Sequence, residues 1–301
     1  MATLQDIKRR VRSVRNTRKI TKAMELVAAA RLRRAEARIV ELRDYADRMQ
    51  ELTAGTARAA SSLRGLTLLQ QRDPRTVAIV ALTGDRGLAG AFNGQILRRA
   101  FALERELRGE GKEVRWLVVG RRGRSSLEFR RYRLEQAWIG FTDRPSYADA
   151  QAVAHRLAEL YEAEEIDSAV LVYNHYVSPL VQQVTEQRVL PISEDVLARE
   201  QRMDADEEER RQALLGDFIY EPEPEQILER LLPVYLETEL YRALLESAAS
   251  EHGARMTAMR NASKNAAELI DTLTLALNRA RQAEITQEIL EVVAGADALT
   301  G

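Results

Sequence analysis

The loop TGDRGLAGAFNG (residues 83–94) contains the residue types that come nearest to a ligand-binding site in this chain. It follows a short apolar run and precedes a helical pattern, which is where phosphate-binding loops lie. It lacks the lysine and Ser/Thr of a Walker loop and the GxGxxG spacing of a dinucleotide site. We therefore expect its glycines to form a tight turn, with Asp85 capping a helix or pairing with Arg86.

Other residues with catalytic potential are scattered along the chain. His155, His175 and His252 belong to different predicted elements, with no acidic residues at metal-ligand spacing. The acidic run from Asp206 to Glu209 is typical of a solvated loop. No Ser-His-Asp arrangement can be assembled from local signatures, so we expect no catalytic site, no bound cofactor and no metal.

The composition excludes several classes of protein. Lys plus Arg (45) nearly balances Asp plus Glu (46), so the net charge does not indicate a polyanionic partner. The chain has no cysteine, which excludes disulfides and thiolate chemistry. We find no signal peptide, transit peptide or apolar run long enough to span a membrane, and expect a cytosolic chain or one held at a membrane by other proteins.

The middle of the chain predicts a small, mostly parallel α/β domain at residues 75–192, because short apolar runs alternate with helical patterns. The expected strands are 76–83, 113–119, 134–139, 168–177 and 184–190, and the expected helices are 93–108 and 147–164. Residues 61–75 are interpreted as a linker, and 193–221 as a polar, acidic connection.

The C-terminal segment predicts one very long helix. Pro222 and Pro224 mark its start, and Pro233 should kink it or mark its true beginning. From Glu225 to Val293 it would be roughly 100 Å long. Its apolar seam follows a seven-residue repeat, which is typical of a coiled coil; the seam comprises Met256, Met259, Ser263, Ala266, Ile270, Leu273, Leu277 and Ala280.

The N-terminal segment predicts a second helix, from Leu4 to about Thr53, with a seam of the same spacing. The first part of this seam is Leu4, Ile7, Val11 and Val14, and the second runs from Ala28 to Met49. Between them the apolar stripe moves one residue early, to Ile20, Met24 and Val27, which predicts locally altered winding. Two interpretations fit: one antiparallel coiled coil, or two amphipathic helices packed separately on a globular core.

Two surfaces of these helices are candidates for binding. The N-terminal helix is rich in arginine and lysine, including Arg9, Arg10 and Arg12. This concentration of positive charge is compatible with three roles for the helix: binding nucleic acid, forming a solvated face, or contacting acidic protein partners. The C-terminal tip is apolar at Ile285, Ile289 and Val292 beyond the last heptad, and is either docked on its own domain or left bare for partners.

Three stretches resemble the gamma subunit of F-type ATP synthases, in that family's order. They are SVRNTRKITKAMELVAAARLRRAEAR near the N-terminus, the loop TGDRGLAGAFNG, and the C-terminal SEHGARMTAMRNASKNAAELIDTLTLALNRARQAEITQEILEVVAGADAL. Ala89 and Ala91 depart from the family, which often has Cys and Gly there. The resemblance implies α/β plus long helices: a coiled-coil shaft of 1–60 with 222–295, and a Rossmann-like domain at 75–192.

The resemblance also implies a function and partners. Such a chain is a non-catalytic rotor shaft that meets alpha and beta subunits, an epsilon subunit and a membrane c-ring, on the cytoplasmic face of a bacterial membrane. It implies acidic lever segments of beta opposite Arg9, Arg10 and Arg12. Matching the family's motif, Met24, Arg281 and Gln282 are expected near contacts that sense rotation, with simple seam packing an equal interpretation of Met24.

Two other functions are compatible with parts of the sequence. One is an α/β nucleotide-binding enzyme with helical arms, which the missing Walker lysine disfavours and nucleotide titration would test. The other is a coiled-coil nucleic-acid-binding protein, which the near-zero net charge disfavours.

Overall fold

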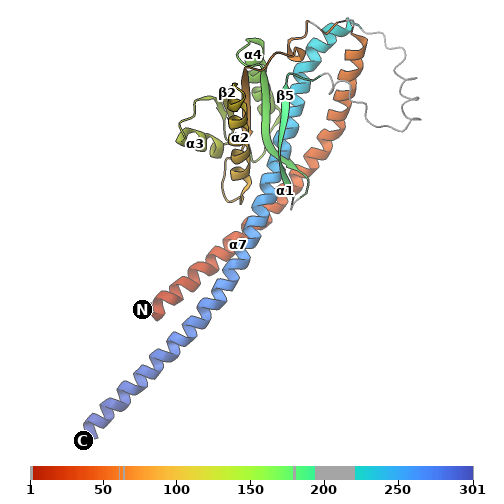
Figure 1. Cartoon of the computed structure of the whole chain (residues 1–301). Coiled ribbons are helices and arrows are strands. Elements are labelled where there is room, and N and C mark those ends of the chain that lie inside the picture. The colour runs from red at the N-terminus through yellow and green to blue at the C-terminus, as the bar shows by residue number, and fades with distance from the viewer. Residues whose placement is uncertain (1–2, 61, 64, 179–180, 194–220, 301) are drawn as a thin grey trace. The chain divides into compact units, whose positions relative to one another are not determined.

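The computed structural model describes residues 3–60, 62–63, 65–178, 181–193 and 221–300, with side chains placed to residue 294 (Figure 1). The chain divides into two compact units. One combines residues 1–30 with 255–301, and the other comprises residues 31–254. The two long helices, α1 (Leu4–Ala59) and α7 (Pro224–Thr300), contribute segments to both units.

A five-stranded sheet forms the centre of the larger unit. Its strands are β1 (Thr76–Leu82), β2 (Glu113–Val119), β3 (Leu134–Trp138), β4 (Ser168–Tyr176) and β5 (Gln182–Leu190). They lie in the order β3-β2-β1-β4-β5, and only β5 is antiparallel to its neighbour. The predicted mostly parallel α/β sheet is therefore confirmed.

Both faces of the sheet are covered, which explains why β1 consists almost entirely of apolar residues. Ala78, Val80 and Leu82 face one core, which contains α4 (Tyr147–Glu162) and the first part of α7. Ile79 and Ala81 face the other, which contains α2 (Phe92–Gly109) and α3 (Arg121–Phe129). Side chains alternate between faces because the strand repeat is two residues.

Several helix boundaries differ from the predictions. Helix α1 continues through Gly55 to Ala59, because Thr53 and Thr56 are buried and bond back to the carbonyls of Met49 and Leu52. Packing here outweighs the roughly 1 kcal/mol that glycine costs inside a helix. Helix α7 begins at Pro224 and runs through Pro233.

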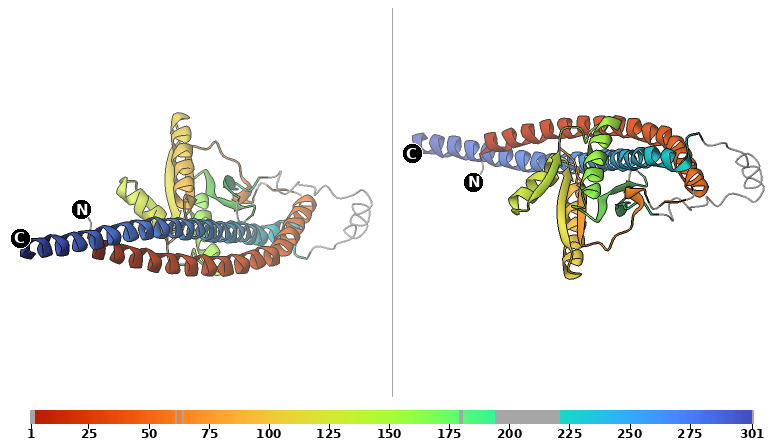
Figure 2. Two further views of the ribbon diagram at one scale, coloured as in Figure 1. Left: turned by 90° about the horizontal axis from the view of Figure 1, so that it is seen from below. Right: turned by 90° about the horizontal axis from the view of Figure 1, so that it is seen from above.

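Two short elements were not predicted. Helix α3 is only nine residues long and has too few apolar residues to show a helical period. The expected linker contains a 3-10 turn, Thr67–Leu69, whose buried leucines pack against the core. Within this unit, α1 from residue 31 and α7 up to residue 254 run side by side (Figure 2).

In the smaller unit, the heptad positions are the less exposed side of each helix. On α7, Met256, Met259, Ala266 and Ile270 are buried, and the remaining seam residues through Ala280 are half-buried. On α1, Val11 is buried, and Leu4, Ile7 and Val14 are half-buried. The seven-residue spacing therefore identifies the covered face of both segments.

The predicted shift of the α1 stripe is wrong. Thr21 (8% exposed) and Glu25 (7%) keep their seam positions, whereas Ile20 (60%) and Val27 (52%) face outward. The polar seam residues are tolerated because their groups have partners. Thr21 donates to the Arg18 carbonyl at 3.1 Å.

Glu25 is the charged member of this seam. Its carboxylate accepts from Lys22 Nζ at 3.0 Å on α1 and from Arg260 Nε at 3.2 Å on α7. The bond from Lys22 lowers the pKa of Glu25 most, and Arg260 lowers it further, while burial opposes both. Glu25 thus joins the two segments of the unit by charge as well as by packing.

We predict that the glycine at position 120 is required on steric grounds. Gly120 has φ 98° and ψ 140°, and a Cβ there would overlap the Thr83 carbonyl. Gly140 has a similar φ of 102° but open space around a Cβ. Gly120→Ala should lower the free energy of unfolding by about 3 kcal/mol or more, and Gly140→Ala by only about 1–2 kcal/mol. Equal losses in urea unfolding would contradict this explanation.

We also predict an acid-sensitive contribution from Glu25. A carboxylate whose pKa is lower in the folded state than in the unfolded state stabilises the fold at pH values above its unfolded-state pKa. This stabilisation is lost as the pH falls through the folded-state pKa. The effect should therefore be present at pH 7 and disappear below about pH 4. Glu25→Gln should lower the melting temperature at pH 7 and flatten its decline in acid. Glu268→Gln, at an exposed carboxylate of α7, is the control and should change neither; indistinguishable curves for the two variants would refute the prediction.

Candidate partner-binding surface

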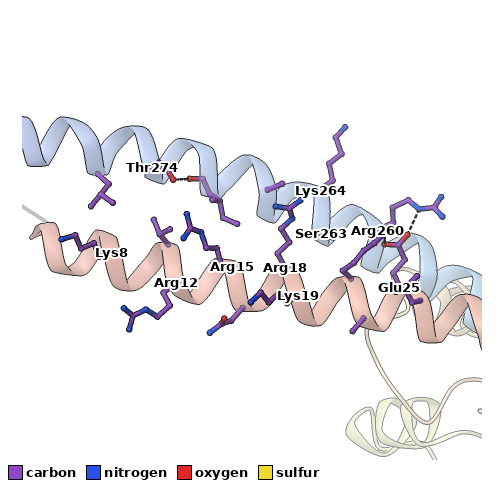
Figure 3. Close-up of a pocket in the computed structure, with 18 residues that line it drawn as sticks. Lys8, Arg12, Arg15, Arg18, Lys19, Glu25, Arg260, Ser263, Lys264 and Thr274 are labelled. Carbon is purple, nitrogen blue, oxygen red and sulfur yellow. Dashed lines mark hydrogen bonds and ion pairs between the residues drawn. The ribbon is translucent and has the colours of Figure 1, made fainter.

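An open groove of about 1370 Å³ lies between the α1 and α7 segments of the smaller unit (Figure 3). Its lining includes eight basic side chains against one carboxylate, Glu25: Lys8, Arg12, Arg15, Arg18, Lys19, Lys22, Arg260 and Lys264. Arg15 and Arg18 point from α1 toward α7. Small residues such as Ala23, Ser263 and Ala267 line the space between the charges. We call this surface the basic groove.

The three arginines expected to meet acidic partners are all exposed on the α1 segment of the smaller unit. Arg12 lines the basic groove, and Arg9 and Arg10 are exposed on the same helix. Arg9 pairs with Asp6 at 2.7 Å, with 81% of the arginine side chain exposed. Such an exposed pair contributes little to stability, so Arg9 remains available to another anion.

The residues expected to sense rotation do not form one cluster. Met24 is half-buried on α1, next in sequence to the seam residue Glu25. Arg281 and Gln282 are both exposed on α7, directly after the last seam residue. The backbone carbonyl of Gln282 accepts from the Thr286 hydroxyl at 2.8 Å.

The end of α7 carries a group of exposed apolar side chains. Every side chain from Arg281 to Ala294 is exposed. The large apolar ones are Ile285 (47%), Ile289 (57%), Leu290 (64%), Val292 (72%) and Val293 (51%). Exposed groups of this size usually mark an interaction site. We call residues 285–293 the apolar tip.

The glycine-rich loop is organised by its own carboxylate. Asp85 accepts from the backbone N–H of Arg121 (3.0 Å), Gly140 (2.8 Å) and Thr142 (3.2 Å). Arg121 begins α3, so the Asp85 carboxylate caps the N-terminus of that helix, where a negative charge is favourable. The expected capping role is confirmed, and the expected pairing with Arg86 is replaced by these backbone contacts.

The space beside this loop is also filled. A Cβ added at Gly84 would lie 2.6 Å from a carboxylate oxygen of the buried Glu251 on α7. Two acidic side chains at the carboxyl edge of the sheet disfavour an anionic ligand at this point.

The histidines take structural positions. His175 Nδ1 lies 2.6 Å from Glu246, and the buried His252 donates from Nε2 to the Asp143 carbonyl at 3.1 Å. His155 is exposed on α4. Within the described ranges, no group of three or more His, Cys, Asp or Glu residues could hold a metal ion.

Sequence reasoning missed the α7 side of the basic groove. Arg260 and Lys264 are four residues apart and flank the seam, which is where charged residues of paired helices lie. This four-residue spacing is the feature of the sequence that could have revealed the α7 side of the groove. Their juxtaposition with Lys22 and Glu25 depends on the register of two segments more than 200 residues apart in sequence.

No helix within the described part of the chain is long and apolar enough to cross a membrane.

Known proteins similar to this chain form one group. A family model described as ATP synthase matches residues 3–299. The chain is 45% identical to the ATP synthase gamma chain of Rubrobacter xylanophilus over 299 residues, 99% of each chain. It is 43% identical to that of Moorella thermoacetica, over 99% of this chain and 100% of the other.

Solved structures show the same fold. The central stalk and c-ring structure of the Tetrahymena thermophila mitochondrial ATP synthase contains a chain 26% identical, with a TM-score of 0.57 over 81% of this chain and 99% of that one. A chain of the Euglena gracilis mitochondrial ATP synthase, 18% identical, has a TM-score of 0.67 over 98% of this chain and 94% of that one. From the sequence relatives and the family model, this chain belongs to the ATP synthase gamma chain family.

Proposed function

We propose that this chain is the central rotor shaft of an F-type ATP synthase. It couples ion-driven rotation of a membrane ring to conformational change at catalytic sites on partner beta subunits, and does not itself catalyse a reaction. Family membership over residues 3–299 is the observation that carries this proposal. The Tetrahymena central stalk and c-ring structure and the Euglena F1 and c-ring structure, each of which contains a similar chain, agree with it.

The surface of the smaller unit supports a rotary mechanism because it differs from face to face. The basic groove lies along one side of the helix pair, while Ile20 and Val27, which are not part of its lining, are exposed on α1. Identical beta subunits arranged around such a surface would each meet a different chemistry. Coupling requires contacts that differ between states, and rotation of an asymmetric surface supplies them.

We further propose the architecture and contacts of the shaft. Residues 1–60 and 222–295 form an antiparallel coiled coil, and 75–192 form the α/β domain. Arg9, Arg10 and Arg12 face acidic lever segments of beta. Met24, Arg281, Gln282 and the apolar-tip residues Ile285, Ile289 and Val292 contact the surrounding alpha and beta subunits. The exposure of the apolar tip supports a surrounding apolar sleeve, because water contact with these side chains is unfavourable.

The remaining partners follow from the same proposal. They are the epsilon subunit and the membrane c-ring, with the chain held peripherally on the cytoplasmic face of a bacterial membrane. The Asp85 and Glu251 carboxylates beside the glycine-rich loop support a non-catalytic role, because their negative charge disfavours a nucleotide phosphate there. An α/β nucleotide-binding enzyme is correspondingly disfavoured.

Copurification tests the proposal directly. A tagged copy of this chain, expressed in its native host, should bring down alpha, beta and epsilon subunits in fixed stoichiometry. The complex should hydrolyse ATP and pump ions when placed in vesicles. Recovery of the chain with none of these subunits would refute the proposal.

We predict that charge reversal at Arg9, Arg10 and Arg12 weakens coupling. All three are exposed, so the triple change to Glu should leave the melting temperature nearly unchanged. Repulsion from acidic levers should lower ion pumping per ATP hydrolysed by roughly twofold or more in vesicles.

A matched control reverses three exposed arginines of the larger unit, Arg98, Arg105 and Arg133, to Glu. This variant carries the same change in net charge and should couple normally. Equal coupling in both variants would exclude an electrostatic role for the N-terminal arginines.

We predict the register of the coiled coil from its two seams. Antiparallel helices bring together residues whose numbers have a nearly constant sum, here near 280, so Ile7 lies by Leu273 and Val11 by Ile270. Ile7→Cys with Leu273→Cys should form an intramolecular disulfide, since facing seam positions come within about 7 Å between Cα atoms. Ile7→Cys with Ala280→Cys, one heptad out of register, should oxidise far more slowly. Faster bridging of the second pair, or bridging of neither, would show that the register is wrong.

A further inference from the structure

Helix α7 is attached to the sheet by apolar packing. Within the larger unit, the side chains of Leu228, Leu232, Tyr235, Leu236, Leu240, Ala243 and Leu244 are buried in one core with β1 and β4. Burial of this kind is strong but non-directional, because it depends on area and not on the alignment of particular atoms. Its extent nevertheless prevents α7 from moving independently of the sheet.

Helix α1 contacts the rest of the same unit through apolar side chains such as Ala57, which packs against the core around the sheet, and through a set of polar groups. Arg31 pairs with Asp143, Arg38 donates from Nη1 to the Pro145 carbonyl at 3.1 Å, and the Tyr176 hydroxyl donates to Glu36. These three contacts lie along two turns of α1, and we call them the polar clasp. Hydrogen bonds are directional, so they resist sliding and rotation of α1 about its axis.

The polar clasp is partly shielded from water. The Arg31 and Asp143 side chains are 38% and 27% exposed. Burial, and then the bond to Glu36, raise the pKa of Tyr176, so its hydroxyl stays protonated and remains a donor. Partial burial makes such charged contacts stronger than the pairs on an open surface.

The loop that presents Asp143 and Pro145 is held by Asp85. The Asp85 carboxylate accepts from the Gly140 N–H at 2.8 Å and from the Thr142 hydroxyl at 3.0 Å. In return, the Asp85 N–H donates to the Thr142 hydroxyl at 2.8 Å. The glycine-rich loop thus has a structural task that its sequence did not reveal: it fixes residues 140–142, immediately before the polar clasp.

The same loop also contacts α7. The Asp143 carbonyl accepts from His252, while the Asp143 carboxylate pairs with Arg31 of α1. Arg31 is the first residue of the larger unit, and His252 lies two residues before its last, Ala254. The covalent connections between the units are at 30–31 and 254–255, so Asp143 contacts both helices next to the points where the chain passes from one unit to the other.

We infer that the polar clasp transmits torque from the α/β domain to α1, with Asp85 as the positioning residue that holds it in place. The inference rests on the proposed rotor function. Torque applied to the sheet reaches α7 through its buried apolar face. It reaches α1 through the clasp in addition to the packing of buried α1 side chains such as Leu32 and Ala35, so both helices turn with the sheet and neither slips past the other.

The test uses the assembled ATP synthase in vesicles, with ATP hydrolysis and ion pumping measured on the same sample. Arg31→Asp and Asp143→Arg should each lower the ions pumped per ATP by roughly twofold or more, because each leaves two like charges opposed. The double variant restores opposite charges and should regain at least half of the loss. Asp85→Asn should act in the same direction as the single reversals.

Arg33→Asp is the matched control, since Arg33 is exposed on the same helix two residues from Arg31 and outside the clasp. It should couple normally. Hydrogen exchange of residues 140–146 in the isolated chain gives a second readout, and should be faster for Arg31→Asp than for Arg33→Asp. This readout remains available if a variant does not assemble.

The outcomes separate the two proposals. If the complex with the unaltered chain does not pump, the rotor function itself is wrong. If it pumps and Arg31→Asp or Asp143→Arg pump equally well, the clasp does not transmit torque. Failure of the double variant to recover while both singles are impaired would also overturn the inference, because the contact between these two charges would not be the cause.

Discussion

The rest of the structure depends on how one helix, α7, buries its surface in three different ways. From Tyr235 to Gly253 nearly every residue is buried or half-buried. From Met256 to Ala280 only a seam is covered, and from Arg281 to Ala294 every side chain is exposed. A helix covered all round belongs to a core, one covered on a stripe needs a partner helix, and one covered nowhere needs other chains. The helix therefore serves as anchor, paired segment and contact surface along its length.

The sequence predicted those elements whose signal is a regular spacing of apolar residues. The run TVAIVAL identified a strand buried on both faces, and the heptads of α7 identified its covered side. The same criterion failed between Ile20 and Val27, because hydrophobicity alone does not decide which residues are buried. Glu25 could take a seam position only because Lys22 and Arg260 neutralise it, and Arg260 is far away in sequence.

The candidate site was predictable to a similar degree. The exposed arginines and the apolar tip follow from composition and from the end of the heptads. The basic groove does not, because its α7 side becomes visible only once the two segments are aligned. The role of Asp85 was equally hidden: its partners at Arg121, Gly140 and Thr142 lie 36 to 57 residues along the chain. The loop resembles a phosphate-binding site in sequence, but in this fold its Asp85 holds together the backbone of neighbouring segments.

The central claim is that this chain rotates as a unit within a ring of stationary subunits. Since the chain has no cysteine, a single one introduced at the exposed Arg133 can carry a bead or gold particle. With the complex immobilised through its beta subunits, addition of ATP should cause the particle to turn continuously in one direction. Steady ATP hydrolysis with a stationary particle, in complexes shown to retain the labelled chain, would contradict the account.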